Sequence, residues 1–301
     1  MQNHRVTAFG EILFDVYHNY KKLGGAPFNF IYHIKKIIGT GNLITKVGND
    51  ENGKEIINFL KKNNFSTEYI QIDKEYPTGM VKVELSENKI PEFQIFSPAA
   101  WDFIENNESI EKLVNEQTDI LYFGTLAQRS EVSKKTLSSF FGREIKYFCD
   151  LNLRQNFYSK EIIENALKVA DLFKVNLDEL NIIMRFLIEK ELGIEEAVEV
   201  IMNQYDITMM CVTMGEEGAY LANKNEFNRD KQPRQKGELV DTVGAGDAYA
   251  AIMCLGYLQN LPVHKINALA LEFASEICGI EGALPSSDYF YKKYKRELNG
   301  E

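Results

Sequence analysis

Apolar positions along the chain follow two spacings in turn, which predict strands alternating with helices. Residues 5–14 form a nearly continuous apolar run, typical of a buried strand. Residues 26–38 then carry apolar side chains at helical spacing, and Phe30, Ile31, Ile34, Ile37 and Ile38 fall on one face. A second strand at 42–48 and a second helix at 51–63 repeat this order. Strand–helix–strand–helix order favours a parallel sheet.

The pattern changes near residue 78. Residues 78–85 and 91–97 each alternate apolar and polar positions, and a polar turn at 86–90 separates them, which predicts an antiparallel hairpin. After residue 119 the earlier rhythm resumes. We expect strands at 119–124, 145–152, 171–176 and 207–215, a hairpin at 218–227, and helices near 130–141, 160–170, 177–189, 194–204, 245–260, 263–279 and 287–297.

These elements predict one α/β domain spanning residues 1–301. Its core would be a doubly wound, mainly parallel sheet flanked by helices, with a small inserted β-sheet formed by residues near 12–22 and 76–100. Because ligands bind at the carboxyl ends of strands in such folds, we expect the insertion to act as a lid. Trp101 and the neighbouring phenylalanines belong either to the core at the lid hinge, which we favour, or to the pocket wall.

Composition narrows the class of partner. The net charge of −10 argues against a nucleic-acid or anionic-membrane surface, since both need clustered Lys and Arg. The four cysteines are far apart, and no Cys or His spacing suits a metal site. The N-terminal residues lack a secretory apolar region, and no apolar run approaches about 18 residues. We therefore expect a cytoplasmic protein.

The segment Asp241–Asp247, with sequence DTVGAGD, carries the strongest chemical signal. Gly244, Ala245 and Gly246 lead into a predicted helix, whose first N–H groups lack partners and lie at the positive end of its dipole. Small residues leave these N–H groups open to an oxyanion. Asp247 beside them could accept a proton from a hydroxyl nucleophile, or it could simply cap the helix. No Walker A or dinucleotide fingerprint is present.

Four motifs together resemble those of the ribokinase-like (PfkB) carbohydrate kinases. Residues 241–251 look like the C-terminal signature of that family, and Gly24, Gly25 and Asn29 match its N-terminal signature. Asn176 and Glu179 match its Asn-x-x-Glu pattern. Its nucleotide strand is matched by Thr213, Gly215 and Gly218. The motifs occur in the family's order and extend from residue 10 to about 286, so the resemblance covers nearly the whole chain.

The resemblance implies roles for the sugar side of the site. Asp247 would be the catalytic base, and Gly244, Ala245 and Gly246 would form the anion hole for the γ-phosphate. Asp15, which we place at the end of the first strand, would hold sugar hydroxyls. Further sugar contacts would come from Gly24, Gly25, Asn29, Asn152 and Arg154. Alternation in an extended segment would turn Asp150, Asn152 and Arg154 to one side. Arg154 could pair with a phosphate or make a structural ion pair.

The resemblance also implies binding of ATP and Mg²⁺. Asn176 and Glu179 would order Mg²⁺ through water, although the same two residues could form a capping box. The nucleotide residues would be Asn176, Thr213, Gly215, Gly218, Ala274, Cys278 and Gly282, with core packing an alternative for Ala274 and Cys278. Many family members bind a monovalent cation, so K⁺ is a hypothesis here. The matching positions are Asp241, Val243, Ile277, Ile280, Gly282 and Ser286.

Residues 96–104, 121–136 and 150–159 look most like the fructokinase branch, as does the short loop between Asp15 and Gly24. This implies phosphorylation of D-fructose to fructose 6-phosphate. A kinase for 2-keto-3-deoxygluconate or ribose, and a sugar-binding regulatory protein without turnover, are the alternatives. An exposed lid sheet offers unpaired edges, so we expect a homodimer formed through the lid.

Overall fold

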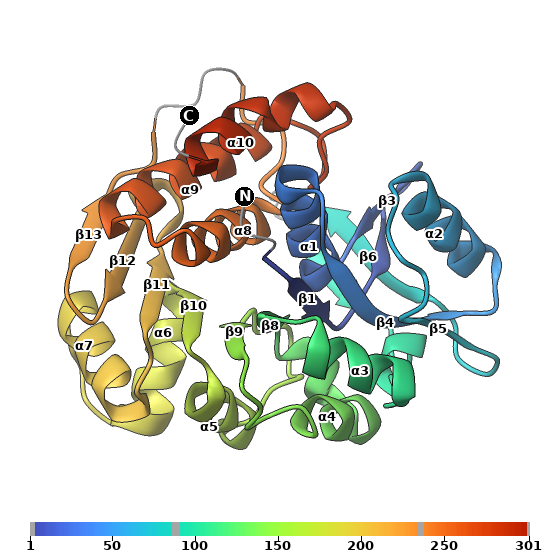
Figure 1. Cartoon of the computed structure of the whole chain (residues 1–301), viewed down its shortest axis with the longest axis horizontal. Helices are drawn as coiled ribbons and strands as arrows, with labels where there is room; N and C mark the ends of the chain where they lie inside the picture. Colours follow the sequence, from blue (N-terminus) through green and yellow to red (C-terminus); the bar gives the residue numbers. More distant parts are fainter. Residues whose placement is uncertain (1–3, 86–90, 234–237, 300–301) are drawn as a thin grey trace.

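The computed structural model describes residues 4–85, 91–233 and 238–299, and a nine-stranded sheet runs through it (Figure 1). The strand order is β13-β12-β11-β10-β9-β8-β1-β4-β5. Neighbours from β11 to β5 are parallel, while β12 and β13 are antiparallel. The strands are β1 (Val6–Phe9), β4 (Asn42–Gly48), β5 (Ile70–Asp73), β8 (Ile120–Phe123), β9 (Lys146–Asp150), β10 (Leu172–Asn176), β11 (Met209–Thr213), β12 (Ala219–Asn223) and β13 (Phe227–Asp230). This order confirms the predicted doubly wound, mainly parallel sheet.

Helices cover both faces of this sheet (Figure 1). One layer contains α1 (Ala26–Ile38), α8 (Ala245–Leu258), α9 (Val263–Ile277) and α10 (Lys292–Asn299), with α2 (Glu51–Lys62) near β4 and β5. The other layer contains α3 (Glu108–Glu116), α4 (Glu131–Ser138), α5 (Lys160–Val169), α6 (Leu177–Ile183) and α7 (Ile194–Tyr205). None of the helices in the described part of the chain combines the length and apolar character needed to cross a bilayer.

Strand alternation divides the core between the two layers. In β8, Tyr122 belongs to the cluster shared with α1, α8 and α9, whereas Leu121 and Phe123 belong to the cluster shared with α3 to α7. All three side chains are fully buried. A central strand covered on both faces is therefore apolar at nearly every position, as the sequence of β8 shows.

A second sheet of four strands adjoins the main one, in the order β3-β2-β6-β7. It contains β2 (Leu13–Val16), β3 (Lys21–Gly24), β6 (Gly79–Leu85) and β7 (Pro91–Ile95). The β2–β6 pair is parallel and the other two pairs are antiparallel. The hairpin and its sheet partners are thus where the sequence predicts them. The predicted turn at 86–90 lies outside the described residues.

Residues 5–14 do not form one strand, and this prediction was wrong. Gly10 has φ 141°, and the chain leaves the main sheet after Phe9 to enter the small sheet at Leu13. Asp15 consequently lies inside β2 and not at the end of the first strand. The residue that follows the turn at the end of β1 is Glu11. An apolar run that changes direction at a glycine cannot be divided by its periodicity alone.

Three other differences from the sequence reading are local. The strand β5 and the helix α3 were not predicted. The helix expected at 177–189 ends its regular part at Ile183 and continues as a wider π-type turn, Met184–Ile188. Trp101 is fully buried, as favoured, and packs in the core cluster beneath the small sheet.

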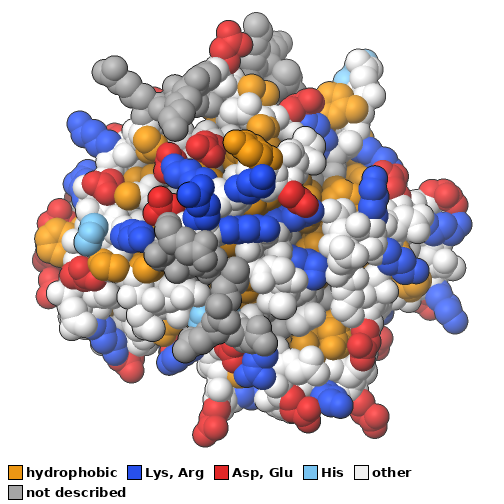
Figure 2. Space-filling view, turned by 45° about the horizontal axis from the view of Figure 1, so that its top comes forward, with side chains coloured by type: hydrophobic (Ala, Val, Ile, Leu, Met, Phe, Trp, Pro, Cys, Tyr) orange, Lys and Arg blue, Asp and Glu red, His pale blue; other side chains and the backbone are white. Residues whose placement is uncertain are grey.

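The strand order reverses between β1 and β8. From β1 the chain proceeds outward through β4 and β5, then returns to β8 and proceeds the other way. Such a switch point opens a crevice at the carboxyl ends of the strands. Figure 2 turns the α9–α10 side forward and shows Lys and Arg gathered near its centre with Asp and Glu between them.

Candidate active site

The helix α8 begins at the crevice with an exposed N-terminus. Gly244 is the N-cap, in the left-handed region at φ 81°, and as glycine it supplies no side-chain cap to the first N–H groups. A Cβ on Gly244 would lie 2.3 Å from the Cβ of Ala283, so both the backbone angle and the close packing require glycine. The Ala245 N–H makes only a long bond, 3.4 Å, to the carbonyl of Thr242. An anion at this helix N-terminus would be favoured by the helix dipole and could accept from the N–H groups of the first turn.

Asp247 stands in this first turn and is held by α1. The Nδ2 of Asn29 donates to Asp247 Oδ2 at 2.8 Å. Burial, and then the nearby charge of Asp150, raise the pKa of Asp247 to about 6, while Asn29, Lys174 and Arg154 oppose the shift. A carboxylate with this pKa is ionised at neutral pH yet basic enough to take a proton from a hydroxyl.

A buried ion pair that the sequence did not predict lies beside the anion hole. Lys174 Nζ donates to both carboxylate oxygens of Asp150, at 3.0 and 2.9 Å, and the two side chains are 7% and 3% exposed. A Cβ on Gly246 would lie 3.3 Å from Lys174 Nζ. Burial lowers the pKa of Lys174, but the charge of Asp150, the hydrogen bonds to Asp150 and the charge of Glu179 together outweigh burial, and the pKa is raised. The lysine therefore remains a cation next to the helix N-terminus.

Two cavities meet at this helix N-terminus. One, of about 330 Å³, opens under the small sheet, and the other, of about 420 Å³, extends toward α9. The residues that line both cavities are Asn176, Thr213, Thr242 and Gly246. A molecule in each cavity would thus approach the other at the anion hole, with Asp247 in the wall of the smaller one.

The cavity under the small sheet collects most of the predicted sugar-side residues. It is lined by Asp15, Gly25, Asn29, Asn152, Arg154, Gly244 and Asp247, and by Asp150, which we expected on the same side as Asn152 and Arg154. Glu11 and Lys174 also line it, and the sequence reading missed both. Burial and the charges of Asp247 and Asp241 raise the pKa of Asp15 to about 7. Burial also raises the pKa of Glu11 to about 7.

Two local predictions on this side need correction. Asn152 has φ 45°, so residues 150–154 are not an extended segment. Alternation therefore does not explain why Asp150, Asn152 and Arg154 all line the cavity. Gly24 does not line the cavity. A Cβ there would lie 2.6 Å from Asp15 Oδ2, so Gly24 instead leaves room for that carboxylate.

The larger cavity collects most of the predicted nucleotide residues. These are Asn176, Thr213, Gly215, Gly218, Ala274 and Cys278, joined by Ala245 and Gly246 of the anion hole. Its wall is mainly apolar, as suits a flat aromatic base. Gly282 is not among the lining residues.

Asn176 and Glu179 form the capping box of α6. Asn176 Oδ1 accepts from the Glu179 N–H at 2.9 Å, and Glu179 Oε2 accepts from the Asn176 N–H at 2.8 Å. Glu179 Oε1 also accepts from the Leu153 N–H at 2.7 Å. Burial raises the pKa of Glu179, opposed by these N–H groups. Because both oxygens already accept backbone bonds, the arrangement suits contact with Mg²⁺ through water better than direct ligation.

Asp241 organises the loop before the anion hole. Its Oδ1 accepts from the Val243 N–H at 3.0 Å, and its Oδ2 accepts from the Gly282 N–H at 3.1 Å. The loop thereby joins the segment after α9, which carries Ile280 and Ser286, while Ile277 is the last residue of α9. Among the described residues, no cluster of three or more His, Cys, Asp or Glu side chains could hold a metal ion.

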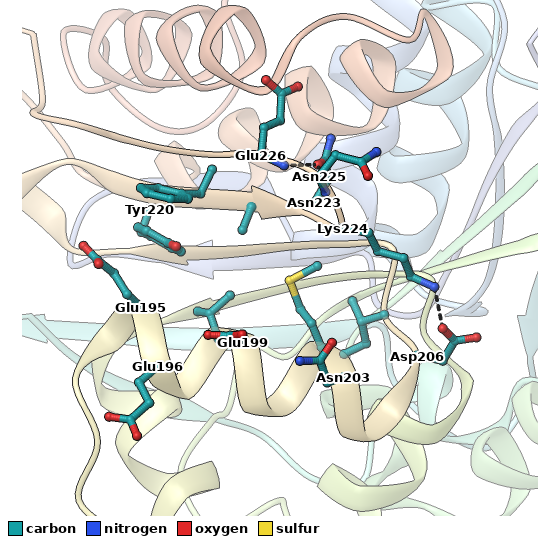
Figure 3. Close-up of a pocket in the computed structure, with 15 residues that line it drawn as sticks. Glu195, Glu196, Glu199, Asn203, Asp206, Tyr220, Asn223, Lys224, Asn225 and Glu226 are labelled. Carbon is teal, nitrogen blue, oxygen red and sulfur yellow. Dashed lines mark hydrogen bonds and ion pairs between the residues drawn. The ribbon is translucent and has the colours of Figure 1, made fainter.

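A third hollow, of about 730 Å³, lies away from this chemistry (Figure 3). It opens between α7 and the β12–β13 hairpin, with Glu195 and Glu199 on one side and Tyr220 on the other. Its lining residues include none of the predicted site residues. Its size alone does not make it the active site, because it lacks the anion hole and a placed base.

Comparison with known proteins agrees with this geometry. Residues 3–288 match the family described as pfkB family carbohydrate kinase. A sugar kinase of Pyrococcus horikoshii is 29% identical over 79% of this chain and 74% of its own length, and fructokinase-2 of Zea mays is 26% identical over 94% and 91%. A crystal structure of the Pyrococcus protein with ATP superposes with a TM-score of 0.77, at 24% identity, over 97% of this chain and 99% of the other.

A fold and a site of this kind define a phosphotransferase that acts on a sugar. The chain belongs to the PfkB family of carbohydrate kinases. A fructokinase of Vibrio cholerae, solved with fructose, ADP and a potassium ion, shares the fold with a TM-score of 0.75 at 20% identity, over 96% of this chain and 97% of the other.

Proposed function

We propose that this protein transfers the γ-phosphoryl group of ATP to the 6-hydroxyl of D-fructose, giving fructose 6-phosphate and ADP. The observation that carries the proposal is the meeting of two cavities at an open helix N-terminus, with a carboxylate of raised pKa in the wall of one. In this arrangement the sugar lies under the small sheet, and ATP lies along the cavity toward α9.

The proposed reaction begins with proton transfer to Asp247. Asn29 donates to Oδ2 of Asp247, and in this proposal Oδ1 accepts the proton of the sugar hydroxyl. The hydroxyl oxygen then attacks the γ-phosphorus in line, the bond from phosphorus to the β–γ bridging oxygen breaks, and ADP leaves. Charge that develops on the γ-phosphoryl oxygens is stabilised by the N–H groups of the anion hole and by Lys174.

The sugar is oriented by groups around this hydroxyl. Asn29 Oδ1 is buried and has no hydrogen-bond partner among the described residues, so it can accept from a sugar hydroxyl. Asp15 can accept from two neighbouring hydroxyls. Arg154 lies at the same cavity and lowers the pKa of Asp15 and Asp247, which indicates that its charge acts inside the site.

Two cations belong to the proposal. Mg²⁺ would neutralise phosphate charge, held through water by Glu179 and Asn176, whose oxygens face the cavity shared with the sugar. K⁺ would bind where Asp241 ties the loop to the segment at Gly282, and would support the anion hole. Equal rates in K⁺ and in a large organic cation would count against the K⁺ site.

A homodimer formed through the small sheet is also proposed. Analytical ultracentrifugation of the protein tests it.

A second candidate substrate is a sugar acid such as 2-keto-3-deoxygluconate. Arg154, exposed at the cavity, could pair with its carboxylate. Ribose is a third candidate. The non-catalytic alternative is disfavoured because Asp247, Lys174 and the glycines before α8 line one cavity, as the proposed chemistry requires.

A coupled assay of ADP release, with a panel of sugars at fixed ATP and Mg²⁺, tests the proposal. We expect kcat/KM for fructose to exceed that for every other sugar in the panel. Preference for the sugar acid or ribose would move the assignment to that kinase. Release of no ADP with any sugar would favour the regulatory protein.

A further inference from the structure

Arg129 lies outside both cavities, yet its side chain is only 4% exposed. It ends the short 3₁₀ turn η2 (Leu126–Arg129), which follows β8. Its Nε donates to Asp102 Oδ1 at 2.7 Å and its Nη2 donates to Asp102 Oδ2 at 2.8 Å. Asp102, in η1 (Ala100–Phe103), is 2% exposed. Two parallel charged bonds of this kind fix both partners in one geometry.

The same guanidinium reaches the base of the small sheet. Its Nη2 also donates to the carbonyl of Phe96 at 3.0 Å, one residue beyond β7. It lies 4.0 Å from the centre of the Trp101 ring. A Cβ on Gly79, the first residue of β6, would lie 2.3 Å from Trp101 Nε1, so the backbone of β6 rests directly on this indole. The start of β6 and the end of β7 therefore both meet groups that Arg129 contacts.

Arg129 also contacts the loop that follows β9. Its guanidinium lies 4.6 Å from the centre of the Phe157 ring. The Phe157 N–H donates to the carbonyl of Arg154 at 3.0 Å, which closes a turn over the residues that face the sugar cavity. One buried side chain thus touches the supports of two cavity walls. One wall is the hairpin with Val81 and Ile95, and the other is the loop with Asn152 and Arg154.

We propose that Arg129 is a positioning residue that sets the small sheet and the 152–157 loop at the spacing required for the sugar. The inference rests on the proposed function, because it assigns the sugar to the cavity between these two walls. Arg129 itself touches neither substrate. A lysine in its place could keep the charge, but it could not make the paired bonds to Asp102, reach Phe96 and lie flat on two rings at once.

The test compares Arg129→Lys with a matched control, Arg143→Lys. Arg143 also pairs with a carboxylate, that of Glu111 at 2.8 Å, and its guanidinium lies 5.0 Å from the centre of the Phe140 ring. Unlike Arg129, it links α3 to the segment after α4 and not to either cavity wall. Steady-state kinetics should show the KM for the sugar raised about tenfold in Arg129→Lys, the size of one lost charged hydrogen bond, with the KM for ATP within about twofold. Arg143→Lys should change neither constant.

A binding measurement separates positioning from mere stability. Trp101 is the only tryptophan, and it contacts Arg129 and β6 directly, so its fluorescence reports on this junction. Titration with the preferred sugar, without ATP, should change the Trp101 emission in the wild-type protein. The midpoint should rise about tenfold in Arg129→Lys. Asp102→Asn, which keeps the shape but removes the charge, should raise the same midpoint in the same direction.

The outcomes are distinct. If Arg129→Lys melts at a lower temperature but keeps the wild-type sugar KM and fluorescence midpoint, Arg129 is only structural and the inference is overturned while the proposed function stands. If the wild-type protein shows neither sugar-dependent ADP release nor sugar-dependent fluorescence across the panel, the proposed function fails and this inference fails with it.

Discussion

Replacement of Lys174 gives a specific prediction because the charge of this side chain has two separate roles. It neutralises Asp150, with which it forms a pair that is almost completely buried, and it lies beside Gly246 at the anion hole. Replacing it by methionine keeps most of the side-chain volume and removes the charge. Asp150 would then be a buried carboxylate without its partner, which typically costs about 3–5 kcal/mol of stability.

Lys174→Met should also change the chemistry. The charge of Asp150 raises the pKa of Asp247, and Lys174 opposes it. Without the lysine, the pKa of Asp247 should rise above its value of about 6, by about one unit for each 1.36 kcal/mol of added repulsion. The acidic limb of the pH–rate profile should therefore move to higher pH. Loss of the cation at the anion hole should lower kcat about 10²–10³-fold.

Two further variants separate these effects. Lys46→Met breaks another buried pair, Lys46–Asp73 at 3.0 Å, with side chains 10% and 8% exposed, far along the sheet at β4 and β5. It should lower the melting temperature without moving the pH profile. The double variant that combines Lys174→Met with Asp150→Asn should recover the stability and the original position of the acidic limb of the pH–rate profile. Its kcat should stay low. A Lys174→Met protein whose kcat and pH profile stay near wild type, while only its melting temperature falls, would refute this reasoning.

Two further predictions concern the carboxylates and the anion hole. Asp15 has a folded-state pKa of about 7, raised from its ordinary value of 3.8, so its contribution to stability is lost as the pH rises from about 4 through about 7. Asp15→Asn should therefore raise the melting temperature at pH 8 relative to wild type, leave it nearly unchanged at pH 3.5, and raise the KM for the sugar. An equal change at both pH values would contradict the linkage. Gly244→Ala should abolish turnover, because the new Cβ would lie 2.3 Å from the Cβ of Ala283 and the residue would have to keep φ at 81°. An ADP-release assay, with a nucleotide titration beside it, measures this loss. Full activity would show that the anion hole does not need glycine at this position.

The sequence was sufficient where the signal is local. Buried strands such as β8 and β10 follow from their apolar runs, and the α8 N-terminus follows from the small residues before Asp247. These features depend on neighbours within a few positions. The motifs also identify Asn29 and Asp247 in the sequence. Only the structure shows that these two side chains, 218 positions apart, form a hydrogen bond.

Contacts between distant segments could not be predicted in this way. Lys174 is a charged residue in an otherwise apolar strand. A buried charge needs a partner, and the sequence reading did not use this signal. Identifying Asp150 as that partner requires the β9–β10 register, in which the two residues are aligned. Asp15 was misplaced for a related reason, because a turn at Gly10 sends the chain into another sheet.

The most direct test of the central claim is the rate of Asp247→Asn with the sugar that the wild-type protein prefers. Asparagine fits the same space and can still bond Asn29, but it cannot accept the hydroxyl proton. The claim predicts a loss of kcat of about 10²–10⁴-fold or more, the usual worth of a general base, with sugar binding by Trp101 fluorescence retained. Near-normal phosphorylation by Asp247→Asn would contradict it.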